Sequence, residues 1–172
     1  MASLIDELIQ TLEKENKAYQ ELHVLSTQKT DIIVKGDIQA LTDIVEKEQI
    51  LMTNQVQPLE KKRRECTNDI ATVISRKPED LTLSKLIELM GSQPETQKRL
   101  SEVRDKLQDT MKQMVKVNDM NKVLLKESLE LVEFDINLFN SMRQAPLTAN
   151  YDRNAYNVGE HMRVPRAFDK SQ

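Results

Sequence analysis

The residues of this chain that could perform chemistry are few, and their spacing does not assemble a catalytic or metal site. Neither His23 nor His161 has a potential metal ligand near it at helical spacing. Cys66 is the single cysteine, so it cannot form a disulfide within the chain, and a reducing compartment is expected. The sequence contains no glycine-rich phosphate loop and no Gly-x-Ser-x-Gly, His-Glu-x-x-His or Cys-x-x-Cys motif. We therefore predict that the protein is not an enzyme and holds no metal or cofactor.

The basic run KKRR at residues 61–64 suggests two further possibilities, an activated thiol and a contact with nucleic acid. Its cations adjoin Cys66 and could lower the pKa of that thiol. Cys66 nevertheless lies in phase with the apolar residues of its helix, so a small buried residue is expected. Glu60 and Glu65 flank the run, no aromatic residue interrupts it, and the chain has a formal net charge of −3. We expect a solvated helix face, and nucleic acid is not an expected partner.

Composition and the amino-terminal segment indicate a helical protein of the cytoplasm. Aromatic residues make up 3% of the 172 residues and glycine occurs three times, which favours long helices over sheets. The segment MASLIDELIQ has neither the basic region nor the long apolar run of a signal peptide. Purely apolar runs reach two or three residues, far fewer than the roughly 20 needed to span a bilayer. We expect a soluble, cytoplasmic protein without stable membrane insertion.

Apolar residues recur at helical spacing along most of the chain and predict an all-α fold. The expected architecture is an elongated antiparallel helical bundle or coiled coil with three long helices and one short helix. The helices are predicted at about 3–34, 37–76, 82–90 and 94–143, within a bundle of residues 1–145. Residues 146–172 lack usable periodicity and contain two prolines, so we expect a flexible C-terminal tail.

Local signals define the second long helix. Gly36 is placed to end the helix before it, and Asp37 is placed to cap the new one. Pro58 removes a backbone hydrogen bond, so a kink or short break is expected near residues 56–58. The apolar residues expected on the inner face of this helix include Ile38, Val45 and Met52.

The last long helix has polar residues in the middle of its apolar face. With Met111 at heptad position a, Asn118 falls at a, whereas Asn121, Ser128 and Asp135 fall at d. Apolar residues flank this polar row on both sides, as in a helix that contacts two neighbours.

Two interpretations of this pattern remain open. In one, both contacts are intramolecular, within a three-helix bundle, and the asparagines fix the register of the helices. In the other, the apolar residues after Leu124 receive an amphipathic helix of a partner. The last helix would be roughly 70 Å long and the first roughly 45 Å. Part of the longer helix must then be solvated, self-associated or bound.

Three stretches of the chain resemble the FlgN family of flagellar export chaperones. They are GDIQALTDIVEKEQILMTNQVQPLEKKRRE at residues 36–65, LTLSKLIELM at residues 81–90 and NDMNKVLLKESLELV at residues 118–132. The tail segment NYDRNAYNVG is similar to the ends of Gram-positive members. The resemblance covers nearly the whole chain and rests on the order and spacing of these stretches together.

The resemblance implies a role in binding rather than in catalysis. Members of the family bind the C-terminal helical regions of the hook–filament junction proteins FlgK and FlgL. They prevent premature association of these subunits and pass them to the flagellar type III export apparatus. A structural coiled coil that self-associates through the same surface, without a secretion client, remains the alternative.

In the family, the C-terminal part of the chaperone binds the substrate, so we expect the client surface in the last long helix and the tail. The expected contact residues are Leu124, Leu125, Leu129, Leu131, Val132, Ile136, Leu138, Phe139, Met142, Tyr151 and Tyr156. Asn118, Asn121 and Ser128 are expected to set the register of the helices. Residues 146–172 would act as a client-binding or regulatory tail.

Overall fold

The computed structural model describes residues 2–144, and every regular element in this range is helical. The α-helices are α1 (Ala2–Lys35), α2 (Ile38–Leu51), α3 (Gln57–Val73), α4 (Leu83–Leu89) and α5 (Pro94–Gln144). A π-helical turn, η1 (Met52–Val56), joins α2 to α3. Two 3₁₀ turns, η2 (Pro78–Asp80) and η3 (Met90–Ser92), precede and follow α4. The all-α prediction is confirmed, while the predicted tail, residues 146–172, lies outside the described residues.

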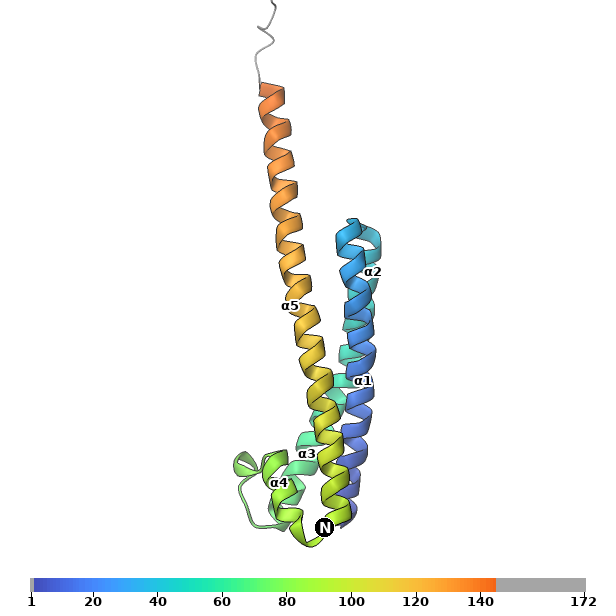
Figure 1. Cartoon of the computed structure of the whole chain (residues 1–172), viewed down its shortest axis with the longest axis vertical. Coiled ribbons are helices and arrows are strands. Elements are labelled where there is room, and N and C mark those ends of the chain that lie inside the picture. Colours follow the sequence, from blue (N-terminus) through green and yellow to red (C-terminus); the bar gives the residue numbers. More distant parts are fainter. Residues whose placement is uncertain (1, 145–172) are drawn as a thin grey trace, which may run out of the picture. The chain divides into compact units, whose positions relative to one another are not determined.

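The chain divides into two compact units, Met1–Val132 and Glu133–Gln172. The boundary between the two units falls within α5. Figure 1 shows the five α-helices. The first unit contains α1 to α4 and α5 as far as Val132. The described part of the second unit is the remainder of α5, residues 133–144.

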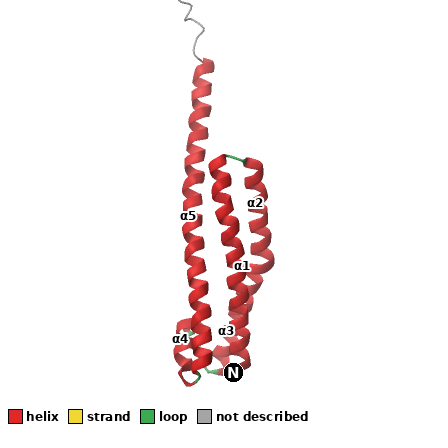
Figure 2. Ribbon diagram, turned by 45° about the vertical axis from the view of Figure 1, so that its right-hand side comes forward, coloured by secondary structure: helices red, strands yellow, loops and turns green. Residues whose placement is uncertain are grey.

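Within the first unit, α1 and α2 form an antiparallel pair joined by a very short turn (Figure 2). Gly36 adopts a positive φ of 67°, which a residue without a Cβ reaches at no steric cost. The Asp37 side chain then accepts a hydrogen bond of 3.0 Å from the Ala40 backbone N–H and caps α2. The turn predicted from these two residues is present.

The predicted interruption at Pro58 takes the form of a π-helical turn. Pro58 lies in the first turn of α3, directly after η1. Proline has no N–H for a bond to the carbonyl four residues earlier, and its ring would clash with that carbonyl. The wider π turn accommodates both constraints, and Val56 remains fully buried. The helix therefore continues through this region without a loop.

The apolar core of the first unit lies around α1, α3, α4 and the first part of α5. Its most deeply buried side chains include Ile5, Leu8, Ile9, Leu12, Ile70, Leu86 and Leu100. Leu107 is the last buried apolar residue of α5 among the described residues. Beyond it, the buried residues of α5 are Thr110 and Asn121, which are both polar. Beyond Leu107, apolar residues of α5 such as Met114 are only half-buried, and Thr110 and Asn121 form hydrogen bonds with α1.

The predicted inner face of α2 is partly wrong. Ile38, Val45 and Met52 are exposed, whereas Ile44 and Leu51 are buried. Two consecutive residues on a helix point about 100° apart. The narrow contact with α1 therefore buries Ile44 but not Val45, and Leu51 but not Met52.

Candidate functional site

A groove of about 630 Å³ lies between α1, α2, η1 and the middle of α5 in the first unit. Its inner surface includes Leu22, which is buried, and Met114 and Leu125, which are half-buried. Val45 and Met52 line it from the α2 side, and Leu129 lines it from α5; these three are exposed. Exposed apolar side chains around a concave surface are typical of a site that binds another apolar surface.

Asn121 joins α5 to α1 beside this groove. Its Nδ2 donates a hydrogen bond of 2.8 Å to the Ser26 carbonyl oxygen. Thr30 Oγ1 donates a bond of 2.7 Å to Asn121 Oδ1. Both polar ends of the buried amide are therefore satisfied by α1, and this geometry is specific to one alignment of the two helices.

A half-buried carboxylate, that of Glu48, joins α1 to α2 beside the groove. Ser26 Oγ donates to Glu48 Oε1 at 2.9 Å, and Lys29 Nζ donates to Glu48 Oε2 at 2.6 Å. The Lys29 and Glu48 side chains are both largely shielded from solvent. Because their charges compensate each other, this part of the groove is close to neutral.

The α5 side of the groove carries two lysines. Lys122 and Lys126 line it and are exposed. Lys126 Nζ lies 3.7 Å from Glu130 Oε1. This is an exposed ion pair within one helix, and such pairs contribute little to stability. Lys122 forms no ion pair within residues 2–144.

The predicted contact residues of α5 are accessible to different degrees. Leu124 and Leu125 are half-buried in the first unit. The exposed residues are Leu129, Leu131 and Val132 in the first unit and Ile136, Leu138, Phe139 and Met142 in the second. Tyr151 and Tyr156 lie outside the described residues.

The three residues predicted to set the register differ in their surroundings. Asn121 forms the contacts with α1 described above. Asn118 is exposed, lines the groove and forms no side-chain hydrogen bond within the described part of the chain. Ser128 Oγ donates to the Leu124 carbonyl oxygen of its own helix at 2.8 Å, which holds no neighbour in place.

Sequence reasoning missed Phe134 and the α2 wall of the groove. Phe134 is 63% exposed but falls at heptad position c, outside the apolar face that the pattern defined. Val45 and Met52 were expected to face inward and instead line the groove. The sequence did contain a signal for Phe134, because an aromatic residue at a position outside the apolar face is expected to be exposed.

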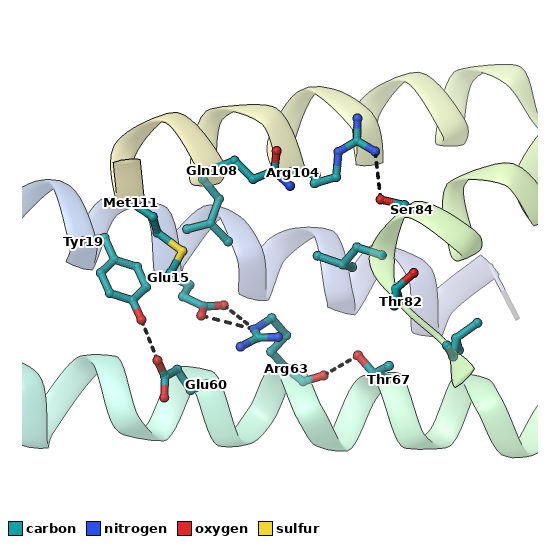
Figure 3. A pocket seen from close by; sticks show the side chains of 13 residues that line it. Glu15, Tyr19, Glu60, Arg63, Thr67, Thr82, Ser84, Arg104, Gln108 and Met111 are labelled. Atoms are coloured by element: carbon teal, nitrogen blue, oxygen red, sulfur yellow. Dashed lines mark hydrogen bonds and ion pairs between the residues drawn. The ribbon is translucent and has the colours of Figure 1, made fainter. Parts of the chain in front are cut away.

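A second hollow, of about 470 Å³, is lined by residues of α1, α3, α4 and α5, most of them polar (Figure 3). Arg63 Nε donates to both carboxylate oxygens of Glu15, at 3.2 and 3.0 Å. Tyr19 Oη donates to Glu60. Burial raises the pKa of Glu15, although the Arg63 charge opposes this, and burial also raises the pKa of Tyr19. Because the Glu15 carboxylate is already paired with Arg63, this cluster does not present Glu15 as a free reactive group.

Other groups considered for chemistry are not assembled into a site within the described residues. Cys66 is buried as predicted, and burial raises the pKa of its thiol, which makes it less reactive. Residues 2–144 contain no cluster of His, Cys, Asp or Glu that could hold a metal ion. None of the helices described is both long enough and apolar enough to cross a bilayer.

The helical bundle, its groove and the exposed apolar residues of α5 are typical of proteins that bind other chains through a helical face. The family model described as FlgN protein matches residues 1–158, most of the chain. The chain therefore belongs to the FlgN family, and the resemblance to flagellar export chaperones is confirmed. Searches of curated proteins and of solved structures each gave no match.

Proposed function

We propose that the protein is a cytoplasmic chaperone that binds the C-terminal helical regions of FlgK and FlgL and passes them to the flagellar type III export apparatus. It acts by binding and not by catalysis. Membership of the FlgN family supports the chaperone class. The names of the clients follow from the family resemblance of the sequence.

The observation that carries the proposal is the row of exposed apolar side chains along the C-terminal half of α5. From Leu129 to Met142, aliphatic and aromatic residues recur without burial. A helix that only filled a core would bury them, and a helix that only faced water would have polar residues there. An amphipathic helix of a client would cover them through anchors at helical spacing.

Burial of each anchor by the client should contribute measurably to affinity. Full burial of a Leu or Phe side chain is worth about 1.5–3 kcal/mol. Since 1.4 kcal/mol corresponds to about tenfold in affinity, replacement of one anchor by Ala should weaken binding roughly 10-fold or more. The same replacement should change the free energy of unfolding by less than about 0.5 kcal/mol, because the side chain is exposed in the free protein.

The test compares Leu131→Ala, Leu138→Ala and Phe139→Ala with Ile38→Ala. Ile38 is a matched control, because it is 72% exposed on α2 and Leu131 is 61% exposed on α5. Affinity for a peptide from the C-terminal region of FlgK or FlgL and the free energy of unfolding would be measured for each variant. The α5 variants should lose affinity and keep stability, and the control should keep both. If all three α5 variants bind as tightly as the control, the client surface is elsewhere.

A further inference from the structure

The groove between α1, α2 and α5 has walls of different charge, and this difference restricts what it can hold. The α5 wall carries Lys122 and Lys126, while Lys29 on the opposite side is compensated by Glu48. The inner surface is apolar, at Leu22, Met114 and Leu125. An occupant that matches both features is apolar toward the groove and negative along one edge only.

The length of the groove fits a segment of helix. Its lining residues on α5 extend from Met114 to Leu129. This interval corresponds to about 22 Å along the helix axis, or about four turns of a bound helix. The α2 wall includes Met52, where the π turn η1 begins, and methionine side chains adapt to irregular partners. Turns of this kind are frequent at functional sites.

We propose that this groove binds one amphipathic helix of the client, with acidic side chains on the edge that faces Lys122 and Lys126. The proposal rests on the proposed function, because it takes the occupant to be the client. It adds a second contact surface for the client, besides the exposed residues of α5. It also predicts which edge of the bound client helix is acidic. The apolar side of the client helix lies on the inner surface of the groove, and Val45 and Met52 flank it on the α2 side.

Charge reversal on α5 tests the acidic edge. The double variant Lys122→Glu/Lys126→Glu should weaken binding of a FlgK or FlgL C-terminal peptide roughly 10-fold at low salt, and less at high salt. The matched control is Lys112→Glu/Lys116→Glu, which has the same spacing and charge change on the same helix, away from the groove. Its members are also exposed, and Lys112 has one weak partner, Asp109 at 3.9 Å, as Lys126 has Glu130. Equal loss of affinity in the two double variants would overturn the acidic edge.

Methionine oxidation tests which surface is covered. In the free protein, dilute hydrogen peroxide should oxidise both Met52 and Met120, which are 38% and 47% exposed. Met120 does not line the groove and is the internal control. Saturating client peptide should slow the oxidation of Met52 at least about 5-fold and leave that of Met120 unchanged, as measured by peptide mass spectrometry of the full chain.

Each other outcome identifies a different occupant and overturns the proposal. Protection of Met52 in the free protein at every concentration would indicate that the chain's own residues cover the groove. Protection that appears only as the chain is concentrated would indicate a second copy. If Met52 stays reactive with client bound while Leu131→Ala still weakens binding, the proposed function stands and the groove is not part of the client site.

Discussion

Replacement of Asn121 by Ala should destabilise the bundle far more than the same change at Asn118. The Asn121→Ala variant loses two hydrogen bonds to α1, the one donated to the Ser26 carbonyl and the one accepted from Thr30. Each bond contributes about 0.5–1.5 kcal/mol net, so the loss should be about 2 kcal/mol. It should not be much larger, because Thr30 Oγ1 also contacts the Ser26 carbonyl, at 3.3 Å, and keeps a partner.

The assay is urea denaturation followed by helical circular dichroism, with a thermal melt beside it. A loss of about 2 kcal/mol lowers the melting temperature by roughly 4–8 °C for a chain of this size. Asn118→Ala should stay within about 0.5 kcal/mol of the parent, because Asn118 is exposed and makes no side-chain hydrogen bond in the described part of the chain. Thr30→Ala combined with Asn121→Ala should cost less than the two single changes added together. Equal stability of Asn118→Ala and Asn121→Ala would refute the claim that Asn121 ties α5 to α1.

Three further predictions test the core and the polar cluster of the first unit. Leu12→Ala should cost about 2–5 kcal/mol of unfolding free energy in urea, because Leu12 is fully buried. Arg63→Met should cost about 3–5 kcal/mol, since it leaves the buried Glu15 carboxylate without its cation, whereas Lys62→Met breaks only an exposed pair and should cost less than about 1 kcal/mol. Similar losses for these two variants would contradict the assignment of Glu15 as buried and paired. Because burial raises the pKa of Tyr19, the stabilisation from its protonated phenol is complete below about pH 10, the usual pKa of tyrosine, and is lost as the pH rises further. Melting temperatures measured across this pH range should fall less steeply for Tyr19→Phe than for the parent. If the melting temperatures of the two proteins fall equally steeply, ionisation of Tyr19 does not cause the loss of stability at high pH.

The helical elements were predictable because their signals are local. Periodic apolar residues predict helices, and Asp37 and Thr82 cap α2 and α4 through their own side chains. The π turn before Pro58 was not predictable, because a kink, a break and a π turn all accommodate a proline. Because Val56 is buried, the π turn, which keeps the helix continuous, is favoured over a break.

The candidate site was less predictable because it depends on which faces of the helices meet. Asn118 and Asn121 are the same residue type three positions apart, and only the position of α1 makes one buried and the other exposed. For the same reason, Val45 and Met52 were predicted to face the interior, whereas in the structure they are exposed and line the groove. Heptad positions give the angles between side chains on one helix but not the direction of its neighbours.

Calorimetric titration of the full chain with a FlgK or FlgL C-terminal peptide tests the central claim most directly. The account predicts saturable binding, with a negative heat-capacity change because apolar surface is buried, and a free chain whose mass in sedimentation does not rise over the same concentration range. Absence of binding to either peptide, together with self-association that Leu131→Ala and Phe139→Ala abolish, would contradict it. The exposed residues of α5 would then join copies of this chain, as in the structural coiled coil.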